Sequence, residues 1–190
     1  MPSSPDHAPP PASARERILL CAHDLFYREG IRATGIDRVI AESSVSKVTF
    51  YRHFPSKNDL ILAFLEYRHQ RWMAWFTDAL QRHGQNLDAL VPALGEWFQS
   101  ADFRGCAFIN SVGELGGTLP EVVAVSHRHK EDMMHAIAAL LPASRQRTQH
   151  AQAVALAVDG AIVRAQLDAT PQGALQVLGR ILKWQRAAAR

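Results

Sequence analysis

The run SKVTFYRHFPSK, residues 46–57, gathers cations and hydrogen-bonding side chains in one short stretch. Phe50 and Phe54, with Val45 just before the run, can face a core, so the remaining side chains would point outward. A helix that reads DNA in the major groove needs hydrogen-bond donors and methyl groups on its outer face, with cations beside them for the phosphates. The chemistry that this run could perform is therefore the recognition of duplex DNA.

The overall charge limits how such recognition could work. The 190-residue chain has a formal net charge of only +3, which excludes a histone-like polycation held by bulk electrostatics. Residues 1–57 carry eight basic and six acidic side chains, so this part has little excess charge either. Binding would have to depend on the local cluster of Lys47, Arg52 and Lys57.

Three short helices are expected to position this run. Ser13 begins a capping box for the first helix and Gly30 supplies its stop, while Thr34 is a good N-cap for the second. Ser56 caps a fourth helix after the break at Pro55. The three expected helices span residues 14–29, 34–43 and 46–53. Three short helices with a tight turn between the last two form a helix-turn-helix layout.

The rest of the chain also predicts helices, because no stretch shows the sustained alternation of a strand. The further expected helices span residues 57–83, 87–100, 106–115, 120–141, 144–168 and 171–188. We therefore expect an all-α fold of about nine helices in a helix-turn-helix domain and a larger helical domain. The expected parts are a disordered arm over residues 1–13, a DNA-binding domain over 14–56 and a second domain over 57–190.

Residues 34–57, TGIDRVIAESSVSKVTFYRHFPSK, closely resemble the DNA-binding signature of the TetR/AcrR family of transcriptional regulators. The resemblance implies a homodimer that binds a palindromic double-stranded operator, acts most often as a repressor and is released by a small-molecule effector. It implies no enzymatic activity and no cofactor. Two positions depart from the family pattern: Ser44 stands where the turn usually has glycine, and Val48 precedes Thr49 where a small residue is common.

The resemblance also assigns roles in DNA binding. Tyr51 and Lys57 would contact phosphates, together with the start of the second helix, and Val48 could pack on a thymine methyl group. The full set of candidate DNA-binding residues is Thr34, Gly35, Ser46, Lys47, Val48, Thr49, Tyr51, Arg52, His53 and Lys57.

In the second domain, the segments FRGCAFINSVGEL (103–115) and DGAIVRAQ (159–166) are similar to stretches found in this family. They imply an effector cavity within the helices that follow the DNA-binding domain. Aromatic and sulfur side chains are dense there, as suits a mostly apolar pocket, although the same side chains could form plain core. The candidate ligand-binding residues are Trp72, Phe76, Trp97, Phe103, Phe108, Asn110, Glu114, His127, Met133 and Met134, with Lys130 as a further polar candidate.

The last two helices are apolar on more than one face, which a domain of this size cannot cover alone. A subunit interface is the natural cover, and the family resemblance implies a four-helix interface from these two helices. The last helix has two apolar stripes. One consists of Leu175, Leu178 and Leu182, and the other of Val177, Ile181 and Trp184. The candidate interface residues are Leu156, Ile162, Val163, Leu175, Leu178 and Leu182.

Other kinds of function find less support. The nine histidines suggest a metal site made from His127 or His129 with Glu114 and His150, but their spacing does not favour it, so no metal is expected. Asp159 in an apolar helix is interpreted as an ordinary salt bridge. No nucleophile–base set, phosphate loop or carboxylate pair indicates an enzyme. A DNA-binding dimer without an effector remains the alternative.

The cysteines and the hydropathy of the sequence indicate the cellular compartment in which the protein works. Cys21 and Cys106 fit no metal or redox spacing and indicate two buried thiols in a reducing compartment. The first residues lack the basic and apolar regions of a secretory signal, and no apolar run approaches the roughly 20 residues of a membrane span. We therefore expect a cytoplasmic protein without membrane contact.

Overall fold

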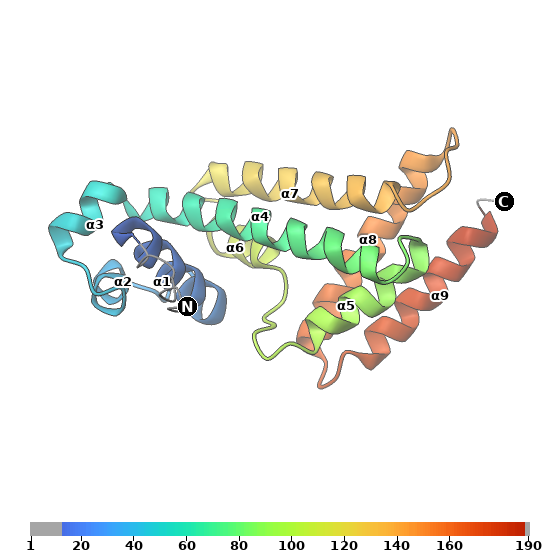
Figure 1. The fold of residues 1–190 in the computed structure, drawn as a ribbon, viewed down its shortest axis with the longest axis horizontal. Coiled ribbons are helices and arrows are strands. Elements are labelled where there is room, and N and C mark those ends of the chain that lie inside the picture. The colour runs from blue at the N-terminus through green and yellow to red at the C-terminus, as the bar shows by residue number, and fades with distance from the viewer. Residues whose placement is uncertain (1–12, 189–190) are drawn as a thin grey trace, which may run out of the picture. The chain divides into compact units, whose positions relative to one another are not determined.

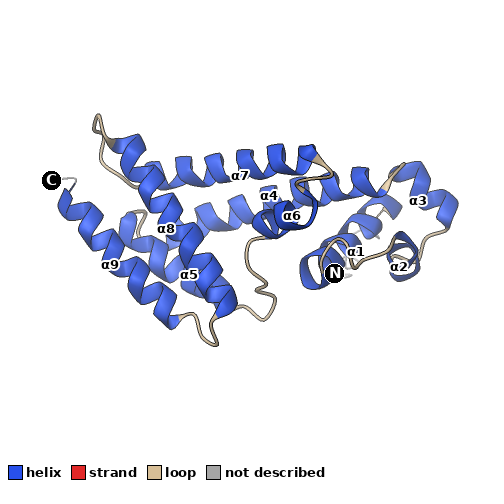
Figure 2. Ribbon diagram, turned by 180° about the vertical axis from the view of Figure 1, so that it is seen from behind, coloured by secondary structure: helices blue, strands red, loops and turns tan. Residues whose placement is uncertain are grey.

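The computed structural model describes residues 13–188, and every regular element in that range is helical (Figures 1 and 2). The α-helices are α1 (Ala14–Glu29), α2 (Ile36–Glu42), α3 (Lys47–His53), α4 (Lys57–Arg82), α5 (Leu90–Phe98), α6 (Ala107–Leu115), α7 (Pro120–Ala138), α8 (Arg147–Leu167) and α9 (Gln172–Ala188), with a 3₁₀ turn at Leu87–Ala89 before α5. This confirms the expected all-α class. The expected disordered arm lies outside the described residues except for Ser13, which caps α1 by accepting the Glu16 N–H at 3.2 Å.

The chain forms two compact units, the first ending at Leu60 and the second beginning at Ile61. In the first unit, α1 packs against α2 and α3. The expected stripe on α1 is fully buried, as are the side chains that meet it from α2 and α3. The buried residues are Ile18, Ala22, Leu25 and Phe26 on α1, with Val39, Phe50 and Phe54 facing them. Each large side chain buried in this way contributes about 1.5–3 kcal/mol of hydrophobic free energy.

The second unit is built around α8, which packs against α7 on one side and α9 on the other. Helix α6 packs on α7, and α5 packs on α9. Helix α4 runs alongside α7 in both views (Figures 1 and 2), and an ion pair between Arg128 and Glu66 joins the two. None of the described helices is both long and apolar enough to cross a bilayer.

The expectation for the start of the second helix was wrong. Helix α2 begins at Ile36 with Gly35 as its N-cap, whereas Thr34 was expected in that role. The Thr34 side chain is fully buried, and its hydroxyl donates to the Gly30 carbonyl at 2.8 Å. Thr34 therefore satisfies an unpaired carbonyl at the end of α1 rather than an N–H at the start of α2.

Candidate nucleic-acid interface and buried aromatic site

Helix α3 begins with a side-chain cap and presents one face outward. The Ser46 hydroxyl accepts the Thr49 N–H at 3.1 Å, which satisfies one of the open donors of the first turn. Phe50 is fully buried and Phe54 is 2% exposed, so both anchor the helix to the core. Val48, on the opposite face, is 71% exposed. Burial of the phenylalanines thus fixes which side of α3 faces solvent.

The turn between α2 and α3 has a Schellman geometry. Ser44 has φ 53°, its N–H donates to the Ala41 carbonyl at 3.2 Å, and the Val45 N–H donates to the Ile40 carbonyl at 3.4 Å. Ser44 therefore takes the left-handed conformation at the position where the family usually has glycine. A side chain other than glycine costs on the order of 1 kcal/mol in this conformation.

The candidate DNA-binding side chains form one continuous outer face on α3. Lys47, Val48, Tyr51 and Arg52 are exposed, and Thr49 and His53 are half-buried beside them. The Ser46 and Thr49 hydroxyls lie 2.8 Å apart and hydrogen-bond to each other. This face carries donors, a methyl-bearing side chain and cations, which are the groups that contact base edges and phosphates in a major groove.

The candidates outside α3 are arranged differently. Gly35 is exposed, but the Thr34 side chain is buried, so any contact from Thr34 to a phosphate is left to its backbone. Lys57 is half-buried, and its ammonium donates to the Ile31 carbonyl at 2.7 Å. An ammonium has three donors, so this bond orients Lys57 without using all of them. Lys57 therefore also fastens the start of α4 to the connection between α1 and α2.

Helix α2 is tied to its neighbours by ion pairs on the surface. Arg38 donates to both carboxylate oxygens of Glu29 at the end of α1 and to Glu42 one turn along α2. Hydrogen bonding to Arg38 lowers the pKa of the Glu29 carboxyl group. Lys47 lies 3.7 Å from the Asp37 carboxylate, which joins the starts of α3 and α2. Exposed pairs of this kind contribute little stability, so their main effect is to orient the side chains.

The second unit contains a cluster of packed rings. Trp72 on α4 stacks on Phe76 with ring centroids 4.6 Å apart and meets the edge of Trp97 from α5 at 5.5 Å. Phe103, in the connection between α5 and α6, packs on Trp97 at 5.2 Å. Phe108 on α6 stacks on the His129 ring from α7 at 3.7 Å. The expected aromatic cluster thus forms, with contributions from several helices.

His129 lies at the centre of this cluster and is only 2% exposed. Burial, together with the charges of Lys130 and Arg68, lowers the pKa of His129 to about 2, so its ring is neutral. Its Nδ1 is 3.2 Å from Nδ1 of His69, and Nε2 of His69 is 3.6 Å from the Asp132 carboxylate. The two Nδ1 atoms are within hydrogen-bonding distance, so one ring donates to the other across α4 and α7.

A small internal cavity of about 10 Å³ lies among these rings. Its walls are Arg68, Trp72, Trp97, Cys106, Ala107, Phe108, His129, Lys130 and Ile162. Trp72 is 6% exposed, and its indole N–H has no hydrogen-bond partner among the described residues. Lys130 forms an ion pair with Asp159 at 2.5 Å, which confirms the interpretation of Asp159 as a salt bridge.

Four of the candidate ligand-binding residues line this cavity: Trp72, Trp97 and Phe108, together with Lys130, the further polar candidate. Phe76 and Phe103 pack behind them in the same cluster. The structure does not bring the others to the cavity wall. The Asn110 amide donates to the Arg104 carbonyl, His127 pairs with Glu131 on the exposed side of α7, Met133 is buried, and Met134 and Glu114 are half-buried.

His129, Arg68 and Cys106 are cavity residues that the sequence interpretation did not select for the pocket. A signal for His129 was present, since it falls on the buried stripe of α7 with Val122, Ser126, Met133 and Ile137. His127, two residues earlier, falls on the opposite side of that helix. Arg68 and Cys106 gave no comparable signal, because their position depends on contacts between distant helices.

The candidate interface residues on α8 and α9 divide into two groups. Ile162, Leu178 and Leu182 are buried within the chain, and Leu175 is half-buried with its Cδ1 near Gly95 of α5. The leucine stripe of α9 therefore packs largely within the second unit. Leu156 and Val163 are exposed, as expected for an interface.

The second stripe of α9 faces solvent instead. Trp184 is 70% exposed and Val177 is 45% exposed, and on α8 Leu156 and Leu167 are 75% and 72% exposed. Between the two helices lies an apolar groove of about 480 Å³ whose walls include Ala157, Gly160, Val177 and Ile181. Together these side chains form an exposed apolar surface strip on α8 and α9.

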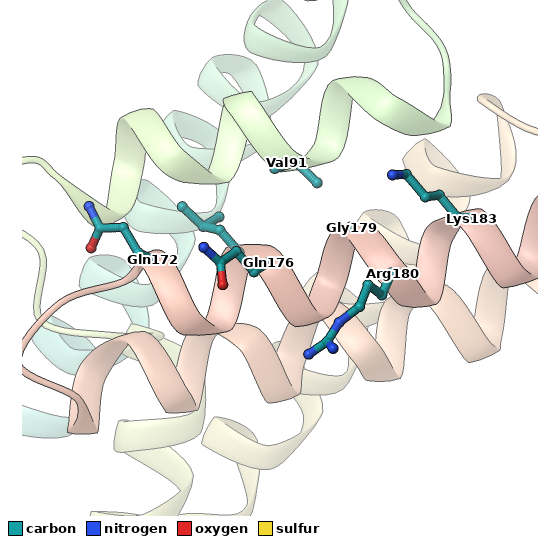
Figure 3. A pocket seen from close by; sticks show the side chains of 7 residues that line it. Val91, Gln172, Gln176, Gly179, Arg180 and Lys183 are labelled. Atoms are coloured by element: carbon teal, nitrogen blue, oxygen red, sulfur yellow. The ribbon is translucent and has the colours of Figure 1, made fainter.

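A third hollow lies on the other side of α9, between α9 and α5 (Figure 3). It has a volume of about 600 Å³, and Val91 and Gly179 are among the residues that line it. Its other lining residues are mostly polar and include Gln172, Gln176, Arg180 and Lys183. This hollow is larger than the internal cavity, but none of the packed rings lines it.

Among the described residues, no group of three or more His, Cys, Asp or Glu could hold a metal ion.

Comparison with known proteins gives matches of two kinds. Residues 18–64 match the family described as bacterial regulatory proteins, tetR family. An HTH-type transcriptional regulator of Lactococcus lactis is 25% identical over 108 residues, which cover 54% of this chain and 55% of the relative. The HTH-type transcriptional activator FasR of Mycolicibacterium smegmatis is 31% identical over 84 residues, 44% of this chain and 38% of FasR. These alignments span about half or less of each relative's length.

The likeness of the folds extends over nearly the whole chain. A TetR-family transcriptional regulator from Streptomyces coelicolor superposes with a TM-score of 0.83 at 29% identity, over 95% of this chain and 92% of that protein. The regulatory protein TetR from Rhodobacter sphaeroides has a TM-score of 0.71 at 23% identity, over 92% of this chain and 99% of that protein, and supports the fold alone. The family match covers the helices that position the outer face of α3, and the structural likeness covers 95% of the chain. The chain belongs to the TetR family of bacterial transcriptional regulators.

Proposed function

We propose that the chain binds a palindromic operator as a homodimer, represses transcription there and is released by a small-molecule effector. The observation that carries the proposal is the outer face of α3, where Lys47, Val48, Tyr51 and Arg52 are exposed while Phe50 and Phe54 hold the helix to its core. Residues 14–56 would serve as the DNA-binding domain and residues 57–190 as the effector-binding and dimerisation domain.

On the operator, each subunit would place α3 in a major groove. Lys47, Val48 and Thr49 would read base edges, and Tyr51 would contact phosphate. Dimers of helix-turn-helix proteins bind half-sites related by two-fold symmetry, which is why the operator would be palindromic.

The exposed apolar surface of α8 and α9 supports the dimer. Side chains as large as Leu156, Leu167 and Trp184 exposed together mark an interaction surface rather than an ordinary solvent face. A two-fold interface places the same surface of both subunits in contact, so a second copy would cover this strip with its own α8 and α9.

The ring cluster of the second unit supports an effector site, because small-molecule pockets are mostly apolar with a few fixed polar groups. The effector can release the operator only by binding more tightly to a conformation with a different half-site spacing. The small size of the cavity favours a second candidate function, a DNA-binding dimer without an effector. Ligands that raise the melting temperature and weaken operator binding would exclude this alternative.

Selection of duplexes from a random pool by the purified full-length protein tests the operator. Enriched sequences should share an inverted repeat with half-sites about one helical turn apart. A pool that stays random, or an enriched motif without two-fold symmetry, would contradict the proposal. A reporter gene placed behind the enriched sequence then separates repression from activation, the activity named for the relative FasR.

A further inference from the structure

Arg15, on the first turn of α1, is held in place by a ring at the end of α3. Its side chain is exposed, and its Cζ atom lies 5.2 Å from the centroid of the Phe54 ring. A guanidinium at this distance over an aromatic face is attracted by the electrons of the ring. Phe54 is 2% exposed and is the C-cap residue of α3. The contact therefore holds the Arg15 guanidinium beside the C-terminal end of that helix.

Other basic side chains of the first unit have a carboxylate or a backbone carbonyl as a partner. They include Arg17, Arg28, Arg38, Lys47 and Lys57. Arg15 and Arg52 differ, because neither forms an ion pair with a carboxylate in the part of the chain that the structure describes. Both are exposed, and Arg52 lies on the last turn of α3, two residues before Phe54. Two cations without acidic partners thus lie at one end of the helix that would enter the major groove.

A phosphate group is the partner that suits Arg15. The contact with Phe54 needs no hydrogen-bond acceptor, so it leaves the N–H donors of the guanidinium available. The planar fork of these donors matches two oxygens of one phosphate. Residues 1–57 have little excess positive charge, so their affinity for a polyanion must depend on local cations of this kind.

We propose that Arg15 contacts a phosphate of the operator, so that each half-site is bound from α1 as well as from α3. Phe54 then has two roles, since it fills the core of the first unit and positions a DNA-binding cation. The contact adds affinity without base preference, because phosphates carry no sequence information. This inference rests on the proposed function, since it adds one residue to the DNA contacts of the dimer.

Anisotropy titrations of the full-length protein with the selected operator and a scrambled duplex, at several salt concentrations, test the role of Arg15. Arg15→Gln removes one cation from each subunit, so the slope of log affinity against log salt should become less steep by about 1.8, or about 0.9 for each lost phosphate contact. Affinity for both duplexes should fall at least about tenfold at low salt. Arg15→Lys keeps the charge and should keep the slope.

Arg28→Gln, at the other end of α1, is the matched control. It removes the same charge, but Arg28 is paired with Glu29, so affinity should change less than twofold and the slope should stay. Arg15→Met is a second uncharged variant in case Arg15→Gln alters folding, because its side chain can still cover Phe54. It should give the same change of slope as Arg15→Gln.

An unchanged slope in both uncharged Arg15 variants would overturn the inference. If their melting temperature falls while the slope stays, Arg15 only covers the Phe54 ring. An equal change of slope in Arg28→Gln would also overturn it, because the effect would then come from the total charge. A wild type that prefers the operator, with variants of the same slope, contradicts the role of Arg15 alone. A wild type that binds both duplexes equally contradicts the proposed function, and the inference with it.

Discussion

The first unit keeps its candidate site on the outside of one seven-residue helix, whereas the second keeps its candidate site inside, among helices α4 to α8. The outer face of α3 needs no rearrangement to contact a ligand, because its side chains already point to solvent. The inner site must widen before it can hold more than a water molecule. The difference predicts that salt screens the charges of the outer face of α3 and affects the interactions of the buried site much less.

The surface strip of α8 and α9 gives the largest expected effect. Trp184→Glu combined with Leu156→Glu places charges in the proposed subunit contact, so the dimer should dissociate at least about 100-fold more readily, since each of the two side chains contributes about 1.5–3 kcal/mol when buried. Sedimentation velocity measures the change. Gln176→Glu, on the side of α9 that faces the hollow of Figure 3, should leave the dimer intact. A double variant that sediments like the wild type would show that this strip is not the interface.

Protonation of His129 gives a test of the buried site that does not depend on any ligand. The pKa is about 2 in the folded protein, below the ordinary value of 6.5, so the unfolded chain binds this proton first as the pH falls. The free energy of unfolding should therefore fall by up to about 1.4 kcal/mol per pH unit below pH 6.5, and this contribution is lost progressively towards pH 2.

Urea unfolding of the wild type and His129→Phe between pH 7 and 5 measures this slope. The variant should lose the part of the slope that comes from His129 and keep the stacking on Phe108. Identical slopes in the two proteins would mean that His129 is not held neutral by burial.

Val48 tests whether the exposed face of α3 reads sequence. Val48→Ala removes methyl groups from a side chain that is 71% exposed, so it should not affect folding. If Val48 packs on a thymine methyl group, affinity for the selected operator should fall by about 1 kcal/mol, roughly fivefold, and the preference at one base pair should relax. Repeating the selection with the variant gives the measurement. An unchanged consensus would assign Val48 no role in reading bases.

Ser44 gives the smallest expected effect. Ser44→Gly should raise the free energy of unfolding by about 1 kcal/mol or less, because glycine adopts the left-handed conformation without the cost that a side chain adds. Thermal or urea unfolding checks this, with Ser43→Gly, at a position with φ −80°, as the destabilising control. A decrease in stability would mean that the serine side chain supports the turn.

The helices and the outward residues of α3 could be predicted because both depend on neighbours in sequence. Ser13, Ser46 and Ser56 cap the helices that they precede, and the spacing of Phe50 and Phe54 determines the outer face of α3. Thr34 was misassigned because its hydroxyl could bond forwards or backwards along the chain, and the sequence does not distinguish the two directions.

The second unit was less predictable because its site depends on packing between distant helices. Both stripes of α9 are apolar, so the sequence could not decide that Leu178 and Leu182 face the core while Trp184 faces solvent. His129 and His127 differ only in the side of α7 on which they lie, and only the buried one joins the rings. Long-range contacts of this kind leave no local pattern.

The central claim, that α3 binds DNA, is tested most directly by fluorescence anisotropy of the selected operator and of a scrambled duplex at low salt. Lys47→Ala should lower affinity for the operator by about five- to 100-fold and reduce its preference over the scrambled duplex. Tyr51→Ala should weaken binding to both duplexes alike, because phosphates carry no sequence information. Lys183→Ala removes the same charge from α9 and should change neither. Unchanged affinity in both α3 variants would contradict the account.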